Sequence, residues 1–171
     1  MSVEDPNRRL GQEPAFAVPP SVLSGALEMA RQAGREVVLA VLGPTATGKS
    51  TLGLALAERH GGEIISCDST AVRTGVDIGT DKVPLEARRG IPHHVVDIVG
   101  PDATYTAADY ARDASEAIRA TLARGRVPIV VGGTGFYYRA LTRGLFPGPG
   151  RDAELRSRLR TIAERRGVEF L

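Results

Sequence analysis

A run of eight residues near the start of the chain has the spacing of a loop that binds phosphate groups. Residues 43–50 have the sequence Gly-Pro-Thr-Ala-Thr-Gly-Lys-Ser, which fits the pattern G-x-x-x-x-G-K-[ST] at every fixed position. Small residues let backbone N–H groups converge on a phosphate, and a lysine brings a point charge to it. The residues that we expect to contact a diphosphate or triphosphate are Gly43, Pro44, Thr45, Ala46, Thr47, Gly48, Lys49, Ser50 and Thr51.

Two further segments place polar side chains where apolar runs end. Asp68 follows the apolar run that begins at Ile64, and Thr134 lies among glycines after residues 127–131. Because the carboxyl ends of neighbouring parallel strands open onto one crevice, we expect Asp68 to lie near the phosphate loop. A carboxylate there can hold a metal, cap a helix or accept a proton, and its position alone does not distinguish these three roles. For the segment around Thr134, a structural turn and a site hydroxyl are equal alternatives.

Cys67 and the pair His93-His94 have the residue types of a reactive or metal site, but their context favours structural roles. Neighbouring side chains in an extended segment point in opposite directions, and no third ligand is suitably spaced near the histidines. We therefore expect both histidines to make structural hydrogen bonds. Cys67 is the only cysteine, so it forms no internal disulfide, and we expect it to be buried at a strand end.

The elements that must position these residues alternate along the chain. Apolar runs predict strands over residues 37–42, 63–66, 94–99 and 127–131. Helices are expected over 21–31, 51–59 and 106–124, after the glycines at 132–135, and from Asp152 to near Gly167. Thr106 can cap its helix with Asp109, and Asp152 can cap the last one. The order predicts an α/β fold, a parallel sheet flanked by helices like that of the P-loop NTPases.

Length and composition fit one globular domain. The chain has 171 residues, a hydrophobic share of 42% and a net charge of +2, so no general excess of positive charge indicates a nucleic-acid partner. Eight arginines between residues 139 and 166 could face phosphates or simply form a solvated helix face. We expect a loosely ordered leader over 1–35 and a P-loop domain over 36–171. No signal peptide or membrane segment is apparent, so a cytoplasmic location is expected.

Taken together, these segments resemble one family, the tRNA dimethylallyltransferases or tRNA isopentenyltransferases. The resemblance extends from residue 37 to about residue 159. It rests on GPTATGKS (43–50), DS (68–69), GVDIGTDK (75–82), PHHVVDI (92–98), YTAADY (105–110), PIVVGGTG (128–135) and a D-x-E-x-R stretch (152–156). A generic small-molecule kinase would share only the first of these motifs.

The resemblance implies a function for each predicted site. The family transfers a dimethylallyl group from dimethylallyl diphosphate to N6 of an adenosine next to the anticodon of tRNA. Lys49 and a Mg²⁺ ion near Ser50 would stabilise the departing diphosphate, and Asp68 would accept a proton from N6. Thr134 matches a family threonine that contacts adenosine and diphosphate. The positions that match tRNA contacts are Asp68, Ser69, Thr70, Ala71, Thr134 and Arg156. The protein is expected to be a monomer.

The sequence departs from the family pattern in two respects. Residues 70–73 are Thr-Ala-Val-Arg, so Arg73 replaces a usual tyrosine near the base, where a guanidinium could stack instead. Family members also continue through a helical tRNA-binding insertion and a C-terminal part, so the chain resembles a truncated form and is expected to have little activity alone. The alternatives are a prenyltransferase for free adenine nucleotides, an ATP-binding P-loop kinase and an inactive remnant.

Overall fold

A four-stranded parallel sheet forms the centre of the protein. The computed structural model describes residues 20–80, 82–146, 148 and 152–170. Its strands are β1 (Leu39–Leu42), β2 (Gly62–Cys67), β3 (His93–His94) and β4 (Val127–Gly132), in the spatial order β1-β4-β2-β3. The parallel α/β architecture predicted from the sequence is confirmed. Residues 1–19 of the predicted leader lie outside the described residues.

Helices occupy the segments in which the sequence predicts them. They are α1 (Pro20–Gln32), α2 (Lys49–His60), α3 (Ala107–Ala123), α4 (Gly135–Arg143) and α5 (Ala153–Arg166), with short 3₁₀ helices η2 (Leu85–Arg88) and η3 (Val168–Phe170). None of the helices in the described part of the chain is both long enough and apolar enough to cross a bilayer.

The predicted helix caps are present. At the start of α3, the Thr106 hydroxyl accepts from the Asp109 backbone N–H at 3.2 Å, and the Asp109 carboxylate accepts from the Thr106 backbone N–H at 3.0 Å. At the start of α5, the Asp152 carboxylate accepts from the Leu155 N–H at 2.8 Å. Each cap satisfies backbone donors that the helix leaves without partners, which fixes where the helix begins.

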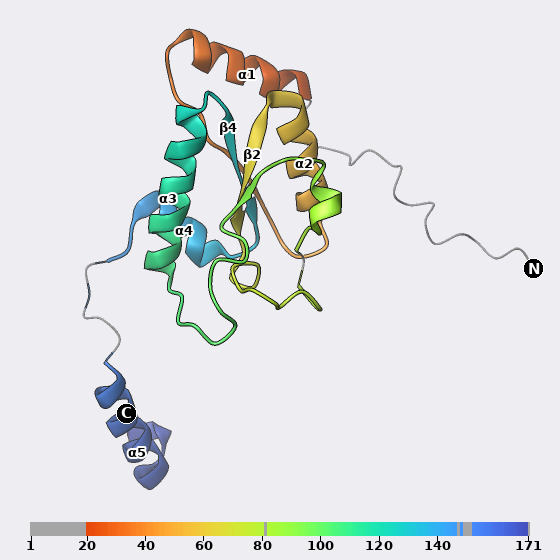
Figure 1. Ribbon diagram of the computed structural model, residues 1–171. Coiled ribbons are helices and arrows are strands. Elements are labelled where there is room, and N and C mark those ends of the chain that lie inside the picture. Colours follow the sequence, from red (N-terminus) through yellow and green to blue (C-terminus); the bar gives the residue numbers. More distant parts are fainter. Residues whose placement is uncertain (1–19, 81, 147, 149–151, 171) are drawn as a thin grey trace, which may run out of the picture.

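Helices cover both faces of the sheet because alternate strand residues are apolar on both sides. Ile64, Ile129 and Val131 point to the face that α2 covers, where they form one cluster with Ala57 of α2 and Leu27 of α1. This arrangement places α2 and its amino end, which follows the predicted phosphate loop, directly against the central strand β4 (Figure 1).

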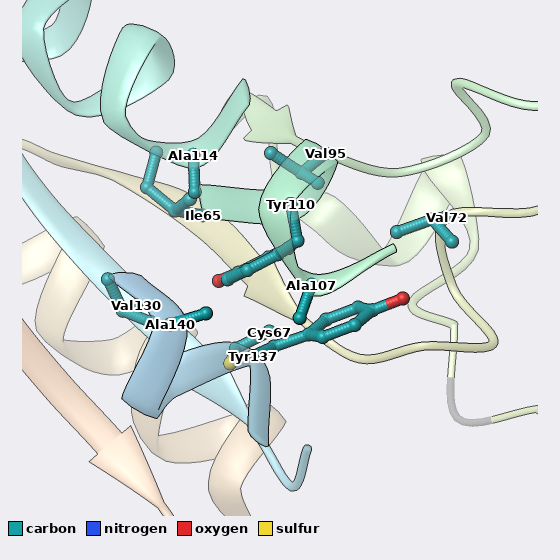
Figure 2. Close-up of a cluster of buried hydrophobic side chains, with 10 residues drawn as sticks. All are labelled: Ile65, Cys67, Val72, Val95, Ala107, Tyr110, Ala114, Val130, Tyr137 and Ala140. Atoms are coloured by element: carbon teal, nitrogen blue, oxygen red, sulfur yellow. The ribbon is translucent and has the colours of Figure 1, made fainter. Parts of the chain in front are cut away.

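The opposite face packs against α3 and α4. Ile65, Cys67 and Val130 lie there in one buried cluster with Tyr110 of α3 and Tyr137 of α4. The two tyrosine rings stack with centroids 4.5 Å apart (Figure 2). Cys67 is fully buried at the end of β2, which confirms its predicted position.

The predicted strand over residues 94–99 is largely wrong. Only His93 and His94 pair with β2, and beyond them a single bridge joins Val99 to Arg73. Val95 and Asp97 have positive φ angles of 59° and 55°, which interrupt extended backbone. The segment instead hydrogen-bonds along residues 71–74, so it forms a loop that follows the carboxyl end of β2.

A buried carboxylate secures the amino end of β2. Glu63 accepts hydrogen bonds from Arg124 at 2.6 and 3.2 Å and from the Thr121 hydroxyl at 3.2 Å, and its Oε2 lies 2.6 Å from His94 Nε2. The hydrogen bonds from Arg124 lower the pKa of Glu63 to about 2, with a contribution from His94 and against the effect of burial. This network joins the end of α3 to two strands.

The strands β2 and β4 leave no room for a side chain between their carboxyl ends. A Cβ atom built on Gly132 would lie 2.1 Å from the backbone oxygen of Cys67, far inside van der Waals contact. Gly132 is therefore required for close approach of the two backbones, which holds the two strand ends side by side.

Replacing Glu63 by Gln should destabilise the protein by about 3 kcal/mol, because Arg124 loses its buried counter-charge. The folded pKa is below the ordinary value of 4.5, so the carboxylate stabilises the fold fully above pH 4.5 and progressively less as the pH falls through about 2. Urea denaturation at several pH values measures this. Glu58→Gln, which breaks an exposed ion pair with Arg89, is the control and should change stability by less than about 1 kcal/mol. Equal losses in both variants would contradict the prediction.

Replacing Gly132 by Ala should destabilise the protein by about 3 kcal/mol or more, because the new methyl group overlaps backbone that cannot rotate away. Gly135→Ala is the matched control, since a Cβ at Gly135 has no atom within 4 Å. Thermal unfolding of the two variants should show a large loss only for Gly132→Ala. A loss within about 0.5 kcal/mol of the control would show that the strand ends can separate without penalty.

Candidate functional site

Three neighbouring strands end at the same level. In the sheet, Leu42 of β1 and Cys67 of β2 are both in register with Gly132 of β4. The next residues along the chain are therefore brought to one edge: Gly43, Asp68 and Gly133. A Cβ on Gly133 would lie 3.2 Å from the backbone oxygen of Gly43, so the turn after β4 and the phosphate loop are in direct contact. The predicted proximity of Asp68 and this loop is confirmed.

The loop over residues 43–50 is tightly folded before α2. Ala46 and Gly48 have positive φ angles of 63° and 78°, and the Thr47 hydroxyl donates to the Pro44 carbonyl at 2.9 Å. The Lys49 ammonium donates to the same carbonyl at 2.5 Å. Because α2 begins at Lys49, its free backbone N–H groups lie beside the loop. The geometry suits an anion, with the lysine held close to it.

The Asp68 carboxylate is oriented by its own chain. Oδ1 accepts from the Thr70 backbone N–H and hydroxyl, both at 2.7 Å, and from the Ala71 N–H at 3.3 Å. Burial would raise the pKa of Asp68, but these hydrogen bonds and the charge of Lys49 outweigh it and lower the pKa below its ordinary value. All three hydrogen bonds engage Oδ1, so Oδ2 keeps its capacity to accept a proton.

Thr134 joins the end of β4 to the turn after β2. Its hydroxyl accepts from the Ser69 backbone N–H at 3.0 Å, and its own backbone N–H donates to the Cys67 carbonyl at 3.1 Å. The hydroxyl thus contacts Ser69, the residue that follows Asp68 in the chain, at the start of α4. The hydrogen bonds of Thr134 are structural and hold it one residue away from Asp68.

A crevice brings some of the predicted residues together and adds others, whereas Thr134 is not among the residues that line it. Its walls include Thr45, Lys49, Ser50, Asp68 and Ala71, with Gly132 and Gly133 at the end of β4. The crevice is also lined by four residues for which the sequence predicts no site role: Lys82, Val83, Arg88 and Val96. Lys82 has a local signal in the sequence, because it ends the glycine-punctuated segment 75–82.

Arg73 makes structural hydrogen bonds and does not line the crevice. Its guanidinium donates to the carbonyls of Pro101 at 2.6 Å and Ala103 at 3.0 Å, and Arg73 is absent from the crevice walls. The guanidinium is held by the loop before α3. The expectation that it could stack on a base is not supported by this arrangement.

Arg156 lies on α5, away from the crevice. It is exposed, and α5 lies apart from the sheet in Figure 1. The structure therefore does not bring Arg156 to Asp68 and Thr134. Its predicted contact with tRNA stays a prediction.

The histidines make the structural hydrogen bonds that the sequence favours. His93 Nδ1 lies 2.8 Å from the Ile91 carbonyl, and His94 pairs with Glu63. Burial is the main reason that the pKa of His93 falls below its ordinary value. No group of three His, Cys, Asp or Glu side chains in the described part of the chain could hold a metal ion.

Comparison with known proteins gives one family for this chain. The model of the IPP transferase family matches residues 72–171. The tRNA dimethylallyltransferase of Solibacter usitatus is 55% identical over 129 residues, which cover 75% of this chain and 42% of that protein. The corresponding protein of Koribacter versatilis is 50% identical over 135 residues, covering 79% and 44%. The chain therefore spans less than half the length of these relatives.

Solved structures agree with the sequence comparison. A full-length tRNA isopentenylpyrophosphate transferase from Bacillus halodurans superposes with a TM-score of 0.64 and 39% identity, over 80% of this chain and 45% of that one. A eukaryotic dimethylallyltransferase acting on tRNA gives a TM-score of 0.64 and 31% identity, over 75% and 35%. The fold, the motifs and the family match agree, and the chain belongs to the IPP transferase family.

Proposed function

We propose that this chain carries the diphosphate-binding and proton-accepting part of a tRNA dimethylallyltransferase. The observation that carries the proposal is the placement of Asp68, with Oδ1 fully engaged and Oδ2 open, in the same crevice as Lys49 and the phosphate loop. The relatives described above are tRNA dimethylallyltransferases, which agrees with this chemistry.

The leaving group would be the diphosphate of dimethylallyl diphosphate. Loop N–H groups and Lys49 would bind the phosphate oxygens and stabilise the charge that grows as the allylic C–O bond breaks. Ser50 lines the crevice beside Lys49, and its hydroxyl is an oxygen ligand of the kind that Mg²⁺ prefers. A bound Mg²⁺ would neutralise further diphosphate charge.

The acceptor would be the exocyclic N6 of adenosine in tRNA. Its lone pair is delocalised into the ring, so the nitrogen attacks the allylic carbon weakly and becomes positively charged as the C–N bond forms. Asp68 would take the released proton on Oδ2. Thr134 and residues 69–71 would contact the nucleoside, which must leave its stack to reach the crevice. Arg156 would contact tRNA outside it.

Asp68→Asn should slow transfer by ~10²- to 10⁴-fold with little change in diphosphate affinity, because it removes only the proton acceptor. Lys49→Met should instead weaken diphosphate binding by roughly 10- to 100-fold, through loss of a charged hydrogen bond. Arg119→Met, an exposed change on α3, is the control. Single-turnover incubation of excess protein with labelled dimethylallyl diphosphate and tRNA measures transfer, and calorimetry measures binding. Prenylated AMP, or a phosphorylated product from ATP, would contradict the proposal.

The transfer rate should show no loss from protonation of Asp68 between pH 5 and pH 8. The pKa of Asp68 is lowered below its ordinary value, so the carboxylate is ionised throughout this range and would be lost only under more acidic conditions. Single-turnover rates across the range measure this. A proton-linked fall between pH 8 and pH 6 that disappears in Asp68→Asn would refute it.

A further inference from the structure

Lys82 occupies an unusual position in the crevice wall. Its side chain is only 6% exposed, although a lysine normally extends its charge into solvent. It ends the segment 75–82, which has no part in the proposed reaction. A buried ammonium at this place needs a reason, because removing its charge from water is costly.

All three donor positions of the Lys82 ammonium are used within the protein. Nζ donates to the Arg73 carbonyl at 2.5 Å, to Asp77 Oδ1 at 2.9 Å and to Asp97 Oδ1 at 2.7 Å. An ammonium has three N–H groups, so none is left for a substrate phosphate. Lys49, by contrast, makes its one hydrogen bond in the described structure to a loop carbonyl. The two lysines therefore serve different purposes.

The contacts of Lys82 lead to Asp68 through two backbone N–H hydrogen bonds. The backbone N–H of Asp97 donates to the Ala71 carbonyl at 3.0 Å, and the N–H of Ala71 donates to Asp68 Oδ1 at 3.3 Å. On the same side, Val72 accepts from the N–H groups of Ile98 and Val99. A displacement of Asp97 would thus move the backbone that orients the Asp68 carboxylate.

Asp97 lies in a loop with strained backbone. Val95 has a φ angle of 59° in the left-handed region, which is strongly disfavoured for a β-branched residue. Asp97, two residues later, has a φ angle of 55°, which Asp adopts more readily than most residues. The ion pair with Lys82 and the hydrogen bond from the Thr74 hydroxyl to the Asp97 carbonyl hold the strained loop against residues 71–74.

We propose that Lys82 is a positioning residue: its ammonium holds Asp97, and through the Ala71 backbone it orients Asp68 with Oδ2 open to a substrate proton. The proposal rests on the proposed function in assigning that proton to the transferred adenosine. Lys82 itself contacts no reacting atom.

Lys82→Met tests this relay without any substrate. By NMR, amide exchange at residues 97–99 should be at least about tenfold faster, and the measured pKa of Asp68 should rise by about 0.5 to 1 as the Ala71 hydrogen bond weakens. Arg112→Met is the matched control, because Arg112 also pairs with two carboxylates, Asp109 and Asp113, but is largely exposed. The control should leave both quantities unchanged. These measurements stay informative even if the chain transfers no dimethylallyl group.

Asp97→Asn separates positioning from simple charge effects. Asn tolerates the left-handed region and keeps the backbone N–H, so the fold should persist while the ion pair weakens. Removing the Asp97 charge would by itself lower the pKa of Asp68, whereas removing the Lys82 charge would by itself raise that pKa. If Lys82 acts by positioning Asp97 and Ala71, both variants should raise the pKa of Asp68. Opposite shifts, no shift in either variant, or unfolding of both would overturn the proposal.

Transfer kinetics measure the effect of Lys82 on the proposed reaction. In single turnovers, Lys82→Met should slow transfer by roughly 10- to 100-fold, while diphosphate affinity stays within about twofold, because a misplaced base affects the chemical step and leaves the phosphate loop intact. A weakened diphosphate affinity with an unchanged transfer rate would place Lys82 in substrate binding and overturn the relay.

Discussion

The site depends on one constraint: three adjacent parallel strands have their carboxyl ends at the same level in the sheet. Gly132 is the centre of this arrangement, because only a residue without a side chain lets β4 approach β2 so closely at Cys67. Since β4 lies between β1 and β2, the phosphate loop and Asp68 open onto a common crevice on either side of the glycine turn. Apolar packing on both faces keeps the strands in this register.

The chain places its two lysines in opposite electrostatic roles. Lys49 lies in a loop with two positive φ angles, and its ammonium makes one hydrogen bond in the described structure, to a loop carbonyl that a phosphate oxygen could replace under the proposed function. Lys82 is saturated by a carbonyl and two carboxylates. The Lys49 ammonium remains available to an anionic ligand, and the Lys82 ammonium fixes the loop that borders the proposed proton acceptor. Both residues are lysines, so residue type does not distinguish the roles. The number of ammonium N–H groups that are already bonded to the protein does distinguish them.

Much of the fold could be predicted because local signals agreed with it. The caps at Thr106 and Asp152 and the apolar runs of β2 and β4 specify their elements within a few residues. The segment after His94 could not be predicted, since its valines favour a strand while tertiary hydrogen bonds impose positive φ at Val95 and Asp97. Arg73 likewise gave no local sign that its guanidinium would bind loop carbonyls.

The lowered pKa of Asp68 is compatible with its proposed role as a base. Before reaction, N6 holds its proton firmly, and no carboxylate could remove it. As the bond to the allylic carbon forms, the nitrogen becomes cationic and strongly acidic, so even a weak base accepts the proton. What the reaction then requires of Asp68 is permanent ionisation and a fixed orientation. The hydrogen bonds to Oδ1 supply both, because the donors that lower the pKa are the ones that hold the carboxylate in place.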